Sequence, residues 1–481
     1  MSTRTGRWMR VIGSTIALTA LVGCATNPVT GKPMLSLVSE EQEIAMGRQA
    51  AQEAEQSIGV VNDPELQAYV QRVGAELAAS SERPQLPWTF KVVDDPTPNA
   101  FALPGGFIFV TRGLMDLMTN ESQLATVVGH EIGHVTARHT VTQLSRAQLA
   151  QVGLGLGSIL VPAVGQAAGA LSSGLSLLFL HYTRDAERQA DELGFRYAYQ
   201  RGYDVRQMAD VFQALERLSG QAEQSALPSW LASHPSEPAR IQSAEARVAA
   251  LTTAPDTTRL GRSAYAQQID QLVYGENPRN GFFQGSTFYQ PDLKLRIDFP
   301  QGWKTQNLSQ AVVAVSPQQD AMIQLTLAQG TADAAAQQFF AQQGLQSGQV
   351  GRTTVNGMPA VVGQFQAQTE QGVLQGTAGF VEYGGRSYQI LGYGPAGQYP
   401  AYDATVRQTI ASFGSVSDPK ILNVQPNRVR IVRTDRRMTL AEFNQRYPSV
   451  ISIADLAIIN QVEGAGTSIP AGTPVKRVVA S

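Results

Sequence analysis

Gly129-His130-Glu131-Ile132-Gly133-His134 is the stretch that decides how this chain folds and what it can do. It reads H-E-x-x-H inside a run whose apolar residues recur at helical spacing. Positions i and i+4 of a helix lie one turn apart on the same face, so His130 and His134 can offer two ring nitrogens to one metal ion. Glu131 lies beside them, where a carboxylate can act on a water that the ion activates. The alternative interpretation is a helix that carries two histidines and no metal.

The start of this helix and a glycine inside it add to the prediction. Asn120 and Gln123 form a capping-box pattern ahead of the apolar positions, which predicts a helix N-terminus at this point. Gly133 lies within the helix, where glycine costs about 1 kcal/mol relative to alanine. We therefore expect a second backbone to approach the helix closely at Gly133.

A catalytic zinc ion needs a third protein ligand beyond the two histidines. The best candidate is Glu187, in the stretch from Thr183 to Gly194. Glu187 and Asp191 are four residues apart in a helical pattern, so their carboxylates share one face. One can bind the ion while the other orients a ligand histidine from behind. A pair of this kind can also be no more than a solvated helix face.

The two motifs H-E-x-G-H and E-x-x-A-D resemble the motif pair of the HtpX and CAAX-prenyl-protease family of zinc metallopeptidases. Residues 99–111 resemble the family's edge strand ahead of the active-site helix, and His234-Pro235-x-x-x-x-Arg240 resembles its downstream element. The resemblance covers roughly residues 33–248. It implies an α+β protein whose peptidase domain is mainly helical, of the zincin type and gluzincin kind, with a small β-sheet.

The resemblance also implies a ligand set. One Zn²⁺ per chain would be held by His130, His134 and Glu187, with the fourth position open. Three protein ligands and an open position suit a catalytic ion, whereas four protein ligands suit a structural one. Glu131 is the implied catalytic base, and Asp191 is the implied partner of a ligand histidine.

Two further elements carry roles by resemblance. His234 either donates to the oxyanion of the tetrahedral intermediate or occupies the open zinc position in a resting state, and Arg240 helps to position it. We expect His139 to cap the end of the active-site helix, where a cation is favoured. In zincins the edge strand pairs with the substrate backbone, a role that falls here on Asn99, Ala100, Phe101 and Ala102. From the residues alone, an ordinary internal strand is equally compatible with this region.

Residues 1–24 have the pattern of a lipoprotein signal peptide. Three arginines precede an apolar run from Val11 to Leu21 that is too short for a stable membrane span. Leu21-Val22-Gly23-Cys24 resembles a bacterial lipobox, which implies a diacylglyceryl group on Cys24, the one cysteine of the chain. Residue 25 is alanine and not aspartate, which implies a periplasmic protein anchored to the inner face of the outer membrane. An ordinary signal peptide is the alternative.

Residues 147–183 contain no Asp, Glu, Lys or Arg. Pro162, Gln166 and several serines interrupt this apolar segment, and the expected ligands on either side of it must share one compartment. We therefore favour an apolar helical lid near the cleft over a membrane span.

The 481 residues suffice for about three domains, and the net charge of −2 argues against nucleic acid as the main partner. We expect a peptidase domain over 25–255, a linker over 256–289, an α/β accessory domain over 290–418 and a small module over 419–481. The last module resembles a LysM domain of βααβ order, which implies binding of N-acetylglucosamine glycans such as peptidoglycan. A purely structural tail is the alternative.

Two functions remain in competition. The first is a zinc metalloendopeptidase of the bacterial envelope that cleaves unfolded or misassembled polypeptides. The second is a latent or non-catalytic chaperone, or a peptidoglycan-associated scaffold lipoprotein. The intact H-E-x-x-H motif favours the first, because a pure binder has no need of Glu131.

Overall fold

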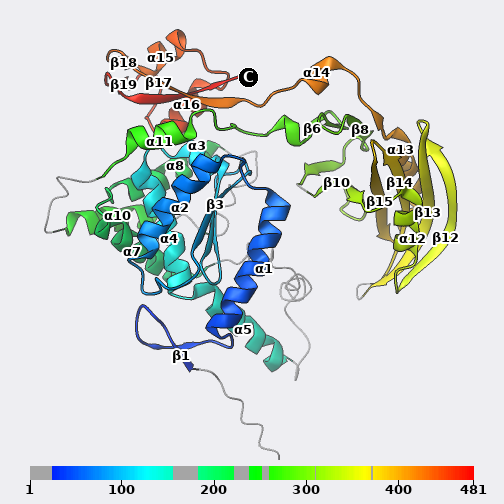
Figure 1. Cartoon of the computed structure of the whole chain (residues 1–481), viewed down its shortest axis with the longest axis horizontal. Coiled ribbons are helices and arrows are strands. Elements are labelled where there is room, and N and C mark those ends of the chain that lie inside the picture. The colour runs from blue at the N-terminus through cyan, green and yellow to red at the C-terminus, as the bar shows by residue number, and fades with distance from the viewer. Residues whose placement is uncertain are drawn as a thin grey trace, which may run out of the picture.

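The computed structural model describes residues 24–154, 182–221, 234, 238–251, 259–308, 310–369 and 372–480. The predicted signal peptide before Cys24 and most of the predicted lid lie outside this part of the chain. Figure 1 shows a helical region, a sheet-rich domain drawn mainly in yellow, and a small C-terminal module in orange and red beside the helical region. The predicted combination of a helical N-terminal domain with a sheet-rich C-terminal region is confirmed.

The helical region surrounds a sheet of three short strands. Its strand order is β3-β5-β4, with β3 parallel and β4 antiparallel to β5. The strands are β3 (Thr89–Val93), β4 (Ala100–Leu103) and β5 (Phe107–Thr111). The helices are α1 (Glu40–Ile58), α2 (Pro64–Ala78), α3 (Arg112–Leu117), α4 (Glu121–Thr136), α5 (His139–Leu154), α7 (Arg184–Gln200), α8 (Gln207–Gln221), α10 (Pro238–Ala249) and α11 (Arg262–Ile269).

Local sequence signals start the first two of these helices. Ser39 and Gln42 form a capping box at the start of α1, with the Ser39 side chain accepting from Gln42 N and the Gln42 side chain accepting from Ser39 N. Asp63 is the N-cap of α2, and Pro64 occupies the first helical position, where proline is favoured. The short β1 (Cys24–Thr26) and β2 (Pro33–Leu35) form a separate two-stranded sheet ahead of α1.

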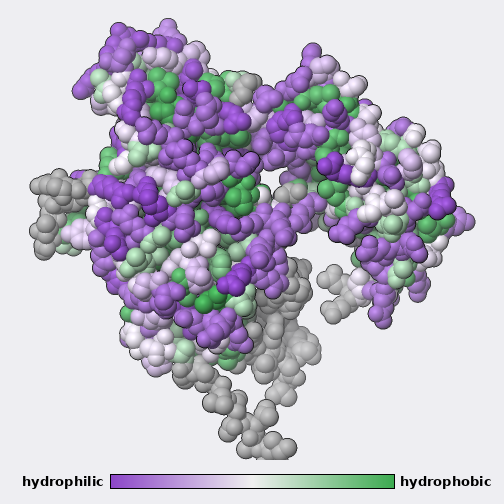
Figure 2. All heavy atoms as spheres, viewed as in Figure 1, coloured by the Kyte–Doolittle hydropathy of each residue, from purple (hydrophilic) through white to green (hydrophobic). Residues whose placement is uncertain are grey.

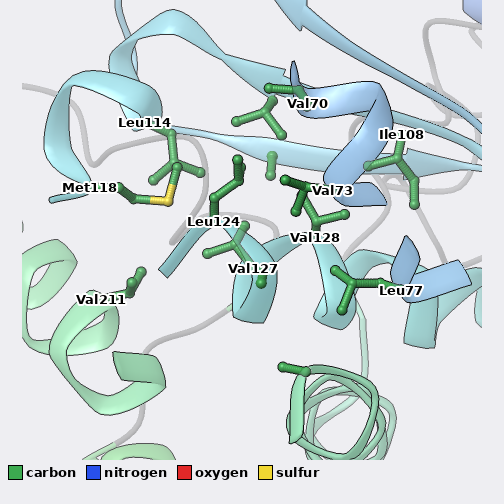
Figure 3. Close-up of a cluster of buried hydrophobic side chains, with 14 of the residues drawn as sticks. Val70, Val73, Leu77, Ile108, Leu114, Met118, Leu124, Val127, Val128 and Val211 are labelled. Carbon is green, nitrogen blue, oxygen red and sulfur yellow. The ribbon is translucent and has the colours of Figure 1, made fainter. Parts of the chain in front are cut away.

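The core of this region lies between the sheet, α2 and α4. Figure 3 shows Val70, Val73 and Leu77 of α2 directed toward Leu124 and Val128 of α4. All five side chains are fully buried. Burying one such side chain contributes about 1.5–3 kcal/mol, so this contact fixes the helix that carries H-E-x-x-H against the sheet.

The outer edge of β3 is closed by side chains of α2. Gln67 accepts from Val92 N and donates to Val92 O, each at 2.9 Å. Gln71 accepts from Phe90 N at 2.9 Å in the same way. These amides satisfy backbone groups that an edge strand would otherwise leave free for another chain, so β3 is not an open edge of the sheet.

The accessory domain is built from antiparallel sheets, which makes it α+β in architecture and not the α/β arrangement that we expected. Its seven-stranded sheet has the order β12-β13-β14-β15-β11-β10-β9, and its four-stranded sheet has the order β16-β8-β7-β6. Alternation in the sequence predicts strands but not their partners, which explains the difference. The strands are β6 (Phe282–Gln284), β7 (Thr287–Gln290), β8 (Leu295–Asp298), β9 (Lys304–Asn307), β10 (Ala311–Val315), β11 (Met322–Ala328), β12 (Leu345–Val355), β13 (Met358–Thr369), β14 (Gly372–Tyr383), β15 (Arg386–Pro395) and β16 (Gly414–Ser415), with helices α12 (Ala332–Phe340) and α13 (Asp403–Ser412).

The C-terminal module has two helices between paired strands. β17 (Arg428–Arg433) is antiparallel to β20 (Pro474–Val479), and α15 (Leu440–Arg446) and α16 (Ile453–Ile459) lie between them in the chain. The short β18 (Met438–Thr439) and β19 (Ser468–Ile469) pair with each other. The order of the main elements is therefore βααβ.

The accessory domain is an insertion between two segments that run side by side. Tyr274 N donates to Asn427 O, and Gln271 N donates to Val429 O, both at 2.8 Å. Figure 1 shows the chain leaving toward the accessory domain through β6 and returning through α14 (Pro419–Leu422) to the C-terminal module. Ile458 of that module belongs to the core of the helical region, so the module and the helical region pack together despite their separation in sequence.

The segment that we expected to be a linker contains part of the peptidase core. Tyr265, Ile269 and Leu272 are buried in the same hydrophobic cluster as Val128. Their apolar character at helical spacing explains why α11 packs instead of remaining extended. The core of the helical region therefore includes residues that we expected to lie in the linker.

Among the described residues, no helix is both long enough and apolar enough to cross a membrane. Figure 2 shows that apolar residues on the visible face form small groups separated by hydrophilic ones.

Candidate metal centre

The helices α4 and α7 approach each other closely because glycines line their contact. A Cβ atom on Gly194 would lie 2.6 Å from His130 N, and a Cβ atom on Gly133 would lie 3.1 Å from Ala190 Cα. The expected close approach at Gly133 is therefore confirmed. This contact holds the H-E-x-x-H motif directly against the helix that carries Glu187.

Four buried side chains converge between these helices. The described residues contain one group that could hold a metal ion, made of His130, His134, Glu187 and His234, with donor atoms within 4.8 Å of one another. His134 Nε2 lies 3.0 Å from His130 Nε2 and 3.4 Å from Glu187 Oε1. His234 Nδ1 lies 2.9 Å from Glu187 Oε1 and 3.3 Å from His130 Nε2. The sequence motifs thus come together in space.

The donor set fits a zinc ion. With bonds of about 2.0–2.1 Å, the ligands of a tetrahedral zinc ion are about 3.3 Å apart. The distances among His130, His134, Glu187 and His234 bracket this value. Imidazole nitrogens with a carboxylate oxygen are also the donor types that zinc prefers.

Hydrogen bonds from behind fix the tautomer of each helix histidine. Asp191 Oδ1 lies 2.9 Å from His130 Nδ1, so this nitrogen carries the proton and Nε2 keeps its lone pair. Gln189 Oε1 accepts from His139 Nε2 at 3.0 Å, which leaves His139 Nδ1 to accept from His134 Nδ1, also at 3.0 Å. His134 Nε2 is then unprotonated as well. Both histidines therefore present Nε2 to the cluster.

His139 has a different role from the one that we expected. It does not cap α4, which ends at Thr136. Arg138 adopts a left-handed conformation with φ 57°, which turns the chain so that α5 begins at His139 and its ring reaches His134 from behind. Sequence reasoning missed Gln189 and Tyr182, whose ring centroid lies 3.8 Å from that of His134. Their positions next to Glu187 in the sequence were the available signal.

The carboxylates of Glu187 and Asp191 do not form a solvated helix face. Glu187 and Asp191 are both buried. Arg240 donates to both oxygens of Asp191 at 2.8 and 2.7 Å, and its Nη1 lies 3.1 Å from Glu187 Oε2. Arg240 also lies over the ring of Phe212, at 4.5 Å from its centroid. The expected partners of the ligands are therefore in contact with them.

Burial and charge shift the pKa values of the cluster in different directions. Burial lowers the pKa of His134 well below its usual value, which favours the neutral ring that a metal needs. Burial raises the pKa of Glu187, but the charge of His234 and the contact of its Nδ1 with Glu187 Oε1 outweigh it, and the net shift of the pKa is downward. Glu187 is therefore ionised.

Glu131 lies in the same cluster without hydrogen-bond partners. Its side chain is 0% exposed, and neither carboxylate oxygen forms a hydrogen bond with the described residues. His234 Nε2 lies 3.6 Å from Glu131 Oε1. Burial raises the pKa of Glu131, and the charge of His234 is the main effect that opposes this shift. Glu131 is thus a buried carboxylate without a hydrogen bond to the described residues, next to side chains of the kind that bind zinc. A carboxylate in this position can act as a general base.

β4 lies at the other edge of the small sheet. Thr111 N donates to Asn99 O at 2.9 Å. This hydrogen bond determines which residues of β4 form backbone hydrogen bonds with β5. By the alternation of an antiparallel ladder, the backbone groups of Ala100 and Ala102 then point away from β5, while Phe101 pairs with it. The predicted strand thus lies at an edge, although its side chains are buried.

A cavity of about 180 Å³ lies elsewhere, between α11 and the C-terminal module. Tyr265, Gln461 and Lys476 are among the residues that line it, and none of the four cluster residues does. The chemistry of the cluster is therefore separate from this cavity.

Two histidines one helical turn apart, a carboxylate from the adjoining helix and a buried glutamate between them define a metallopeptidase domain of the H-E-x-x-H type. Comparison with known proteins agrees. Residues 64–248 match the family model described as Peptidase family M48. This part of the chain is therefore similar to the metallopeptidases of family M48, in agreement with the family that the motifs resemble.

The curated relatives match part of the chain. The chain is 34% identical over 266 residues to the beta-barrel assembly-enhancing protease of Escherichia coli (strain K12), covering 53% of each chain. It is 33% identical over 178 residues to the mitochondrial metalloendopeptidase OMA1 of Arabidopsis thaliana, covering 37% of this chain and 35% of the relative. The chain spans about half the length of the bacterial relatives that it matches.

Proposed function

We propose that this protein is a zinc-dependent endopeptidase of the bacterial envelope that cleaves unfolded or misassembled polypeptides. The observation that carries the proposal is the buried group of His130, His134 and Glu187 around the unpartnered carboxylate of Glu131. The relatives named beta-barrel assembly-enhancing protease support an envelope role. The substrate class remains part of the proposal, because those relatives are matched over about half their length.

Each residue of the cluster has a role in this proposal. His130 and His134 hold the ion through Nε2, and Glu187 holds it through a carboxylate oxygen. When bound, Zn²⁺ supplies a Lewis acid that polarises the scissile carbonyl and increases the acidity of a water. Glu131 accepts the proton of the attacking water and delivers it to the leaving amine. Asp191 keeps the His130 ring in orientation through the 2.9 Å hydrogen bond to Nδ1.

The substrate backbone would bind along β4. The amide groups of Ala100 and Ala102 lie at the outer edge of the sheet by the phase of the ladder. Since main-chain hydrogen bonds give affinity without reading side chains, such an edge suits a peptidase that acts on many unfolded chains. Because Gln67 and Gln71 close the β3 edge, β4 is the edge that supports this role.

His234 would hold the enzyme in a latent state. Its Nδ1 lies within 3.3 Å of both Glu187 Oε1 and His130 Nε2, which makes it a fourth donor for the ion. A site with four protein ligands is closed, and catalysis needs one position for water. These contacts favour a role in which His234 occupies the open zinc position in a resting state, over its alternative role as a donor to the oxyanion. They also support the second candidate function, a chaperone or scaffold whose peptidase domain stays latent.

The envelope location and its anchoring belong to the same proposal. A diacylglyceryl group on Cys24 would hold the protein at the inner face of the outer membrane. Cys24 lies in β1, opposite Leu35 of β2. The βααβ order of the C-terminal module supports a LysM-like fold, and we propose peptidoglycan as its ligand.

Three forms of the purified protein test the proposal: wild type, His234→Ala, and His234→Ala combined with Glu131→Gln. We expect one zinc per chain, slow casein cleavage by the wild type, faster cleavage by His234→Ala and none by the double variant. Cleavage that survives Glu131→Gln contradicts the enzymatic function. If His234→Ala is slower than wild type, the latent state is wrong and the oxyanion role holds.

A His134→Ala variant provides the metal control. We expect it to lose the bound zinc, because the ion would keep too few protein ligands. Retention of a full equivalent of zinc by this variant contradicts the ligand set.

A further inference from the structure

The C-terminal module contacts the start of the active-site helix directly. Gln461 lies just after α16, and its side chain forms a reciprocal amide pair with Gln123 in the first turn of α4. Gln123 Nε2 donates to Gln461 Oε1 at 2.5 Å, and Gln461 Nε2 donates to Gln123 Oε1 at 3.1 Å. These residues are 338 positions apart, so the contact exists only because the module folds back past the inserted accessory domain.

Gln123 is part of the cap that starts α4. Asn120 Oδ1 accepts from Gln123 N at 3.0 Å, which confirms the predicted N-cap. The Gln123 side chain accepts from Thr119 N at 2.7 Å, and not from Asn120 N as a standard capping box would require. Gln461 therefore hydrogen-bonds the side chain that fixes where α4 begins, two helical turns before His130.

The module also holds the end of the preceding helix. Lys476 Nζ donates to Asp116 O at 2.5 Å and to Met118 O at 2.8 Å. Gln461 Nε2 donates to Leu117 O at 3.0 Å. Three consecutive carbonyl groups at the end of α3 thus accept from the module. The last carbonyls of a helix have no intrahelical partners and attract cations, which accounts for the buried lysine at this point.

The backbone of Gln461 supports a role for its side chain. Gln461 has φ 53°, in the left-handed region that favours glycine or asparagine. Gln461 adopts this strained conformation, and its side chain, longer than that of asparagine, reaches both Leu117 and Gln123. Strain of this kind is a reason to look for a function.

We propose that the C-terminal module is a positioning element of the peptidase, and that Gln461 acts by fixing the N-terminal end of α4. Because α4 is a rigid helix, the position of its first turn determines where His130, Glu131 and His134 lie relative to Glu187 on α7. Misplacing such groups by a fraction of an ångström lowers turnover more than it weakens substrate binding. The kinetic consequence rests on the proposed function, whereas the effect on α4 does not.

The test compares two single variants of the full chain. Gln461→Gly removes the side chain at a backbone conformation that glycine adopts without strain. Arg217→Ala is the matched control, because Arg217 Nη2 donates to Val462 O at 2.7 Å and links the same loop of the module to α8 instead of α4. If Gln461→Gly fails to fold, Gln461→Asn replaces it, since asparagine also tolerates this conformation but cannot span the distance.

Hydrogen–deuterium exchange of the α4 amides is the first measurement. We expect exchange in residues 121–128 to become about tenfold faster in Gln461→Gly and to stay unchanged in Arg217→Ala. Equal exchange in the two variants overturns the proposal. This measurement needs no activity, so it remains informative if the protein is not a peptidase.

Kinetics and metal release are then measured in the His234→Ala background. They distinguish a role of Gln461 in positioning the site residues of α4 from a role in stabilising the fold alone. We expect Gln461→Gly to lower kcat about tenfold at unchanged KM and to speed the loss of zinc to a chelator, with Arg217→Ala behaving like the parent. If α4 exchanges faster while kcat and zinc release match the parent, Gln461 braces the fold without positioning the site, and the proposal is wrong. An inactive parent contradicts the proposed function instead.

Discussion

Asp191 Oδ1 lies 2.9 Å from His130 Nδ1, and the same carboxylate accepts two hydrogen bonds from Arg240. The first contact keeps the proton of His130 on Nδ1 and its lone pair on the nitrogen that faces Glu187. The second holds the carboxylate itself in place. The His130 ring is thus oriented through two layers of buried side chains, Asp191 and then Arg240, both contributed from outside α4.

Replacing Asp191 with asparagine removes the negative charge but keeps the size of the side chain. We expect zinc affinity to fall about 10- to 100-fold, because partners of ligand histidines contribute on this scale. Competition with a chelator measures the change. Glu192→Gln, on the exposed side of the same helix turn, is the control and should bind zinc like the wild type. Equal affinities in Asp191→Asn and wild type would show that Asp191 has no effect on the ligand.

Glu131→Gln separates catalysis from stability. We expect the rate of hydrolysis to fall about 10²- to 10⁴-fold, since a general base contributes on this scale, while zinc stays bound. We also expect the thermal midpoint to rise, because Glu131 is an ionisable side chain that is 0% exposed and has no hydrogen bond to the described residues. Calorimetry of the metal-free proteins checks this. A lower midpoint in the variant would contradict the interpretation of Glu131 as an unpartnered carboxylate.

Gly194→Ala inserts a methyl group where α4 and α7 touch. The added Cβ would lie 2.6 Å from His130 N, a backbone atom that cannot move without shifting the helix. We expect a loss of about 1–3 kcal/mol of stability, together with weaker zinc binding as Glu187 moves away from the histidines. Denaturant unfolding and chelator competition measure the two effects. Gly397→Ala, where a Cβ meets nothing within 4 Å, should change neither.

Much of the candidate site could be predicted from the sequence because helical spacing is local information. H-E-x-x-H fixes two nitrogens on one face of α4, and E-x-x-A-D does the same for Glu187 and Asp191 on α7. Gly133 in the middle of a helix predicted a close contact with another backbone, and the structure identifies Ala190 of α7 as the partner. The caps at Asp63 and Asn120 were predictable for the same reason.

Contacts between distant residues left no such signal. The role of His139 depends on the left-handed turn at Arg138 and on Gln189 from another helix. The amide pair of Gln123 and Gln461 joins residues that are 338 positions apart in the chain. Alternation predicted the strands of the accessory domain, but pairing partners are set by the whole sheet, so its antiparallel order could not be derived.

The last prediction concerns pH and the buried carboxyl group of Asp116, beneath the C-terminal module. Burial raises its pKa to about 8, opposed by the charges of Arg112 and Lys476, and Asp116 Oδ1 has no hydrogen-bond partner among the described residues. Above about pH 4 the unfolded chain loses this proton while the folded chain keeps it. The contribution of Asp116 to stability is therefore greatest below that pH, and it falls by at most about 1.4 kcal/mol per pH unit up to about pH 8. Lys476, whose pKa burial lowers to about 7, opposes this trend only above that value.

Asp116→Asn should remove this dependence, because the amide does not titrate. We expect the difference in thermal midpoint between Asp116→Asn and wild type to grow as the pH rises from about 5 to about 7, in favour of the variant. Asp333→Asn, which changes an exposed carboxylate, controls for the overall charge and should show no such trend. Parallel midpoints for wild type and Asp116→Asn across this range would mean that Asp116 is ionised in the folded protein, with Arg112 and Lys476 stabilising the charge.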